Sequence, residues 1–191
     1  MQDIVMNTEE TKLNIRPIKF VMWLFIVASI MLFAAFTSSY IVRRAEGNWV
    51  EFELPSLFML STVLIIASSA TMHWAYLSGK KLNFASQKMA LWLTIVLGIA
   101  FLICQLLSWK QLVAERVYFV GNPSGSFLYV ISGLHGAHII AGIAVLLAPL
   151  IGVYRNIAQV KNMLRLELAS IFWHFLDILW IYLYVFLLLN H

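Results

Sequence analysis

The sequence has few charged side chains: Lys, Arg, Asp and Glu together make up 12% of its 191 residues. Soluble domains carry about 25% charged and about 45–50% apolar residues. Here 62% of the residues are hydrophobic and the mean hydropathy is +0.86. A chain of this length therefore lacks the polar surface of a water-soluble globule, and its composition indicates an integral membrane protein.

Cysteine and enzymatic motifs are also scarce. The single cysteine, Cys104, lies in an apolar run, so no disulfide framework can form and a buried structural thiol is expected. Phosphate-binding, dinucleotide-binding and nucleophile-elbow motifs are absent. The net charge of +4 comes from basic residues scattered over short segments, which argues against nucleic acid as a partner.

Five long hydrophobic runs are present, at residues 20–42, 57–77, 89–109, 127–154 and 168–189. Each reaches the roughly 20 residues that an α-helix needs to cross about 30 Å of hydrocarbon. Pro149 is expected to kink or loosen the last turns of the fourth helix. The predicted fold is all-α, a single transmembrane domain (1–191) of five helices preceded by a short N-terminal segment (1–19).

The 13 basic residues are divided unevenly between the two sides of the membrane. Nine lie on the side of the N-terminal segment: Lys12, Arg16, Lys19, Lys80, Lys81, Lys88, Arg155, Lys161 and Arg165. Four lie on the other side: Arg43, Arg44, Lys110 and Arg116. Since basic residues accumulate on the cytoplasmic side, the N-terminus is predicted to be cytoplasmic and the C-terminus external. Arg16 and Lys19 either bind an anionic lipid phosphate or only determine topology.

The fifth run contains two ionisable side chains, His174 and Asp177. Such groups are costly in a bilayer and need partners, so Asp177 is expected to pair with His174 or with a histidine of the fourth run. At about 100° per residue, both lie on a polar stripe with Ser170 and Tyr184, which should face other helices. The opposite face is expected to meet lipid; it consists of Leu176, Leu179, Leu183, Phe186 and Leu187.

The fourth run has two distinctive faces. Gly133, Ala137 and Ala141 recur every four residues and would allow a neighbouring helix to approach closely. His135 and His138 lie on another face. A helix with requirements on two sides is expected to be central in the bundle.

These polar residues allow several interpretations. The pairs His135–His138 and His174–Asp177 could supply four metal ligands, because bundle metal sites present ligands at i and i+3. A dimetal site usually needs more carboxylates, however, and Asp177 is the only acid within the five runs. Other possibilities are a haem-bearing membrane anchor, a small His/Asp-dependent transporter or channel, and a structural hydrogen-bond cluster that fixes helix packing.

Ordered motifs then point to a family. They are Met31–Phe36 (MLFAAF), Ser68–Ala75 (SSATMHWA), Leu97–Gln105 (LGIAFLICQ), Ser132–Gly142 (SGLHGAHIIAG), Glu167 and Trp173–Trp180 (WHFLDILW). In order and spacing, over roughly residues 19–189, they resemble subunit III of the haem–copper terminal oxidases, which include cytochrome c oxidases and quinol-oxidising relatives. The chain is similar to the five-helix form, which lacks the first two of the seven helices in longer members.

The resemblance implies a non-catalytic subunit of a proton-pumping oxidase in the respiratory chain, in a bacterial inner membrane. Haem and copper would be held by the partner subunits I and II, with no catalytic, cofactor-binding or metal-binding residue in this chain. The subunit would pack on subunit I, retain phospholipid in a cleft between its helices, and support proton uptake and stability. Cytochrome c or quinol would interact with the complex and not with this chain. The residues that match the family's polar positions, as structural groups, are His135, His138, Glu167, His174 and Asp177.

Two positions depart from the family pattern. Ser29 stands where members often have a membrane carboxylate, and Ser108 where many have a Glu three residues after the Gln of the third helix. A proton-related role of those acids is therefore not expected in this chain.

Overall fold

The structure is a computed structural model of the chain that describes residues 2–47, 49, 55–155 and 159–190. The described residues form five helices: α1 (Gln2–Ala45), α2 (Leu57–Lys80), α3 (Phe84–Ala114), α4 (Pro123–Tyr154) and α5 (Gln159–Asn190). All five are long and apolar enough to cross a membrane. The predicted all-α fold of five long apolar helices is therefore confirmed, and their length and composition are consistent with five membrane spans.

Several helices are longer than their hydrophobic runs. α1 is continuous from Gln2, so the segment predicted at 1–19 is helical where it is described. α4 continues through the buried Pro149 to Tyr154, so this proline does not end the helix. The spanning part of α5 is Lys161–Asn190, which adds Glu167 to Asp177 as an acid within a span.

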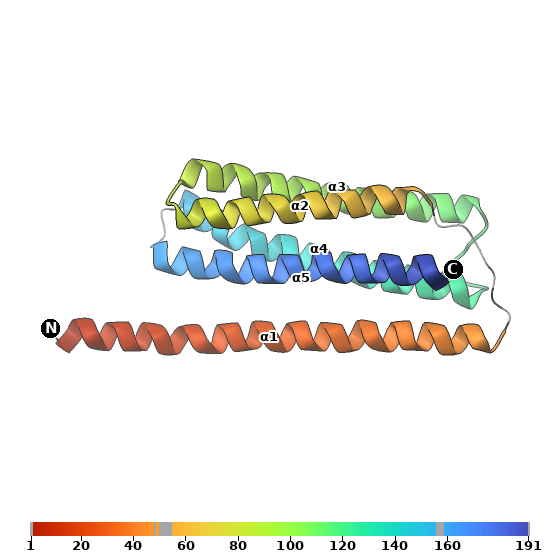
Figure 1. Cartoon of the computed structure of the whole chain (residues 1–191), viewed down its shortest axis with the longest axis horizontal. Helices are drawn as coiled ribbons and strands as arrows, with labels where there is room; N and C mark the ends of the chain where they lie inside the picture. Colours follow the sequence, from red (N-terminus) through yellow and green to blue (C-terminus); the bar gives the residue numbers. More distant parts are fainter. Residues whose placement is uncertain (1, 48, 50–54, 156–158, 191) are drawn as a thin grey trace.

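The helices lie side by side with alternating direction (Figure 1). The start of α1, the α2–α3 turn and the end of α4 lie at one end of the bundle, here called the N-terminal end. The opposite, C-terminal end carries the ends of α1, α3 and α5. α2, α3, α4 and α5 form the main bundle, and within the described residues α1 packs on α4 and α5 alone.

Local sequence explains the turns. Asn83 and Asn122 cap α3 and α4, because their side-chain oxygens accept hydrogen bonds from the backbone N–H groups of Ser86 and Ser124. α2 and α3 both end through a residue with positive φ, Leu82 (58°) and Arg116 (63°). These left-handed residues allow the chain to leave the helix sharply, in the manner of a Schellman ending.

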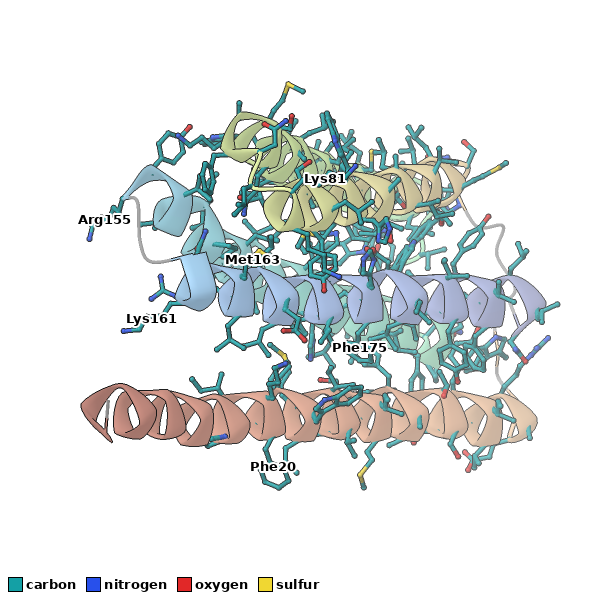
Figure 2. The ribbon with its side chains drawn as sticks, turned by 60° about the vertical axis from the view of Figure 1, so that its left-hand side comes forward. Phe20, Lys81, Arg155, Lys161, Met163 and Phe175 are labelled. Atoms are coloured by element: carbon teal, nitrogen blue, oxygen red, sulfur yellow. The ribbon has the colours of Figure 1, made fainter. Side chains whose placement is uncertain are left out.

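α5 is buried on the side that was expected to face lipid. Leu176, Leu179, Leu183 and Leu187 are all buried, whereas Ile178 is 67% exposed. The prediction of a lipid-facing leucine face is wrong because α5 packs on three helices, α1, α2 and α4, so both its polar stripe and its leucines are covered. Figure 2 shows the two kinds of environment: Phe175 on α5 lies toward α1, and Phe20 on α1 points away from the bundle.

The small residues of α4 divide between core and surface. Ala137 and Ala141 are exposed, and a Cβ on Gly133 would meet only Trp109, at an ordinary 3.5 Å. Closer approaches occur at other glycines, among them Gly142 and Gly98 of α3, where a Cβ would lie 3.1 Å and 2.8 Å from the Trp173 ring. The predicted four-residue repeat therefore does not mark the tightest contact within the chain.

Candidate functional site: polar contacts around α5

The polar stripe of α5 faces α2. His174 Nδ1 lies 2.7 Å from Ser69 Oγ and 3.8 Å from Asp177 Oδ2. The Asp177 side chain is buried, and the ionisable group beside it, His174, lies one turn away on the same helix. The structure thus places Asp177 beside His174 and not beside a histidine of α4.

Two tryptophans on α5 extend the contact with α2. Trp173 Nε1 donates to Ser68 Oγ at 3.0 Å, and Trp180 Nε1 donates to Thr62 Oγ1 at 3.1 Å. Each hydroxyl also donates to a carbonyl of its own helix, Ser68 to Ile65 and Thr62 to Phe58. The hydroxyls therefore act as donor and acceptor at once, which satisfies buried polar groups without a solvent molecule.

The contacts that attach α1 to the bundle are spread along its length. Lys19 Nζ forms an ion pair of 2.8 Å with Glu167 Oε1. Thr37 Oγ1 lies 3.0 Å from the Tyr182 hydroxyl, and the Tyr40 hydroxyl donates to the Asn190 carbonyl at 2.9 Å. Polar side chains therefore supplement a small apolar contact along α1.

His138 belongs to the same α1 interface. Its Nδ1 donates to the Leu134 carbonyl at 2.8 Å, and its Nε2 lies 3.3 Å from the Ser29 hydroxyl. The Ser29 hydroxyl also lies 2.8 Å from the Phe25 carbonyl, so its single proton serves one acceptor at a time. Ser29 therefore contacts a histidine across the α1–α4 interface.

His135 points in a different direction from His138. It is fully buried, and its ring lies against Phe101 of α3 and Trp180 of α5, with centroid distances of 5.7 and 5.0 Å. Within the described part of the chain, neither ring nitrogen has a hydrogen-bond partner. His135 thus occupies the aromatic core, while His138 contacts α1.

The five candidate residues do not converge on one site. His135 lies in the core, His138 and Glu167 contact α1, and His174 with Asp177 faces α2. Among the described residues, no three His, Cys, Asp or Glu side chains gather closely enough to hold a metal ion. The arrangement can hold pairs of helices together through hydrogen bonds and an ion pair that lie at separate interfaces.

Lys19 and Arg16 are the two basic residues predicted to bind a lipid headgroup. Lys19 is engaged by Glu167, and both side chains remain 38% exposed. The side chain of Arg16 lies outside the described part of the chain. Lipid binding by these residues stays a prediction.

Sequence reasoning missed the interhelical bonds of Trp173 and Trp180 and the bond from Gln105 Nε2 to Ser61 Oγ at 3.1 Å. One signal was available: indole and amide groups in the middle of apolar helices require partners, and hydroxyl-bearing residues recur in α2. Which hydroxyl meets which donor depends on helix rotation, which the sequence does not specify.

Comparison with known proteins places the chain in a family. Residues 1–190 match a family model described as cytochrome c oxidase subunit III. The cytochrome c oxidase subunit 3 of Alkalihalophilus pseudofirmus is 29% identical over 167 residues, which cover 85% of this chain and 81% of the relative. That of Bacillus sp. (strain PS3) is 30% identical over 169 residues, covering 85% and 80%. That of Locusta migratoria is 30% identical over 189 residues, covering 92% and 70%.

Proposed function

Because the chain belongs to the cytochrome c oxidase subunit III family, a family of multi-pass membrane subunits, we propose that it is the non-catalytic third subunit of a bacterial oxidase. The complex would reduce oxygen with electrons from cytochrome c. Haem and copper would be held by the partner subunits I and II. The observation that carries the proposal is the family match, which extends over residues 1–190.

The candidate polar residues act in this proposal as structural groups. Glu167 and His138 hold α1 on the bundle, while His174 joins α5 to α2 and has Asp177 beside it on α5. Their contacts lie at separate interfaces, which supports a role in helix packing. Replacing Asp177 or His174 with Leu should loosen the α2–α5 interface and lower assembly of the complex. A variant that assembles normally but loses turnover would contradict the structural assignment of that residue.

The subunit would support proton uptake by packing on subunit I and by retaining lipid. Ser29 and Ser108 occupy the positions at which relatives can carry acids, and each donates to a carbonyl of its own helix. An influence on proton uptake would therefore act through the environment of subunit I and not through a carboxylate at these two positions.

We propose that the basic N-terminal part of α1 binds the lipid. An ammonium group has three donors, so Lys19 can bind a lipid phosphate while it remains paired with Glu167. Arg16 precedes it by three residues on the same helix and lies on a neighbouring part of its surface. This end of the bundle would face the cytoplasm, since nine of the 13 basic residues belong to it.

Orientation is tested with single cysteines in a Cys104→Ser background, one at Lys81 and one at Gly121. In spheroplasts, a membrane-impermeant maleimide should label the Gly121→Cys variant and leave the Lys81→Cys variant unlabelled. The reverse pattern would contradict the proposed topology.

The functional role is tested by comparing the oxidase purified with and without this chain. Initial oxygen consumption should persist without it, because the redox centres belong to the partners. Activity should then decline over fewer turnovers, and proton uptake should slow. Equal turnover lifetime and equal proton uptake in the two preparations would contradict the role. The isolated chain should show no haem absorption band.

A further inference from the structure

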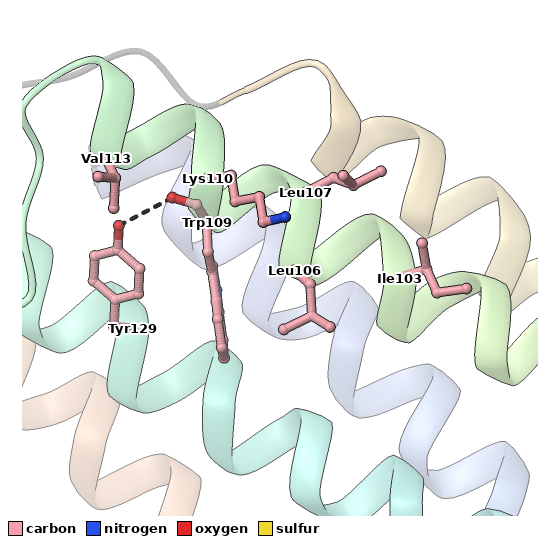
Figure 3. Close-up of a pocket in the computed structure, with 7 residues that line it drawn as sticks. All are labelled: Ile103, Leu106, Leu107, Trp109, Lys110, Val113 and Tyr129. Carbon is pink, nitrogen blue, oxygen red and sulfur yellow. Dashed lines mark hydrogen bonds between the residues drawn. The ribbon is translucent and has the colours of Figure 1, made fainter.

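A groove lies along α3 near the C-terminal end of the bundle, where the start of α4 runs beside it (Figure 3). Its volume is about 600 Å³, and its lining residues are Ile103, Leu106, Leu107, Trp109, Lys110, Val113 and Tyr129. The four aliphatic members are between 45% and 54% exposed, so the groove opens away from the bundle. In a membrane-spanning helix, such a surface faces acyl chains or another protein.

Two aromatic side chains form a fixed wall of the groove. Trp109 Nε1 donates to Ser132 Oγ at 3.1 Å, and the Tyr129 hydroxyl donates to the Val117 carbonyl at 3.0 Å. The Tyr129 hydroxyl also lies 3.4 Å from the Trp109 carbonyl, as drawn in Figure 3. The indole packs on α4 at Gly133, where an added Cβ would lie at an ordinary 3.5 Å from the ring. Since their polar donors are engaged within the protein, both rings offer mainly apolar surface to an occupant.

Lys110 is the one charged residue of the lining. Figure 3 shows its amine beside Leu106 and Leu107, on the groove side of α3. Among the described residues its ammonium group has no ion-pair or hydrogen-bond partner. Lys110 lies near the end of its helix. Its ammonium group can contact a lipid headgroup while its aliphatic stem packs against hydrocarbon.

We propose that this groove binds an anionic phospholipid, with one acyl chain along the apolar wall and the phosphate at Lys110. Ile103 precedes Lys110 by seven residues, or about 10 Å along the helix, so the groove extends from the headgroup level into the hydrocarbon. One lysine near an anionic headgroup should favour an anionic over a zwitterionic lipid about fivefold. The site lies at the opposite end from Arg16 and Lys19 and does not depend on the place of the chain in an oxidase.

The proposal is tested on the full chain in phosphatidylcholine nanodiscs. A small fraction of the lipid is replaced by phosphatidylglycerol with a photoactivatable acyl chain, or by the phosphatidylcholine analogue with the same chain. Cross-linked residues are located by mass spectrometry. The phosphatidylglycerol probe should label residues 103–113 about fivefold more than the phosphatidylcholine probe. Equal labelling by the two probes would mean ordinary annular lipid and would overturn the proposal.

Two variants with matched controls complete the test. Lys110→Gln should remove the preference for phosphatidylglycerol, whereas Lys88→Gln, at the other end of α3, should retain it. Leu106→Trp should fill the groove and lower labelling by both probes, whereas Leu93→Trp, on an exposed part of α3 outside the groove, should not. Labelling that is unchanged in Lys110→Gln would overturn the role of the lysine. Loss of labelling in the purified oxidase, with retention in the isolated chain, would show that a protein subunit covers the groove and would overturn lipid as its occupant.

Discussion

Replacement of Gly98 by Ala tests a close contact between α3 and α5 in the core of the bundle. The added Cβ would lie 2.8 Å from the Trp173 Cη2 atom and 3.2 Å from its Cζ2 atom. The indole cannot retreat easily, because it is fully buried, its Nε1 is bonded to Ser68, and its other edge lies against Gly142. The clash must therefore be relieved by moving α3 away from α5.

The magnitude follows from two opposing terms. Inserting a methyl group into a packed core lowers the free energy of unfolding by about 1–3 kcal/mol. Exchanging Gly for Ala within a helix raises it by about 0.5–1 kcal/mol. Gly136→Ala is a matched control, because its Cβ would lie at an ordinary 3.7 Å from Leu102. Since the helix term is common to both, Gly98→Ala should be less stable than Gly136→Ala by about 1–3 kcal/mol.

The assay is unfolding of the purified chain in detergent micelles, followed by circular dichroism. A second change, Trp173→Phe, removes the part of the ring that Gly98 contacts, and by itself should lower stability by about 1–3 kcal/mol. In the double variant the clash is absent, so Gly98→Ala should become neutral or stabilising. Equal stability of Gly98→Ala and Gly136→Ala, or simple additivity of the two changes, would refute this account of the core.

Three further predictions concern separate contacts, and each is measured by the same unfolding assay. Lys19→Met should lower the free energy of unfolding by no more than about 1 kcal/mol, since its ion pair with Glu167 is 38% exposed; a loss of several kcal/mol would contradict this. Leu82→Gly should raise it by about 0.5–1 kcal/mol, because glycine adopts the φ of 58° without strain; destabilisation would show that the leucine side chain contributes more than the strain. Trp180→Phe should lower it by about 1–3 kcal/mol through loss of the Thr62 bond and of buried ring volume, and unchanged stability would count against that bond.

The number and positions of the helices could be predicted from the sequence because the hydrophobic runs are long and well separated. The ends of the helices could be predicted less well. Hydropathy placed the start of the last run at residue 168, yet the helix begins earlier, so that Glu167 lies inside α5 and reaches Lys19. A charged residue ends a hydrophobic run but need not end a helix, because Glu, Lys and Arg are themselves good helix formers.

The rotation of each helix could not be predicted in the same way. A polar stripe on α5 was read from the angles, and it does face another helix, but its opposite leucines are also buried because three helices surround α5. His135 and His138 are one turn apart, yet one lies in the aromatic core and the other contacts Ser29 of α1. A single sequence states which residues share a face and does not state how many neighbours cover it.

The central claim is that this chain is a subunit of an oxidase complex. The most direct test is to capture the tagged chain from its native membrane in mild detergent and to identify the co-purifying proteins by mass spectrometry. We expect a large polytopic subunit with haem and a copper-binding subunit, in equal stoichiometry with this chain. Recovery of the chain alone, or only with further copies of itself, would contradict the claim.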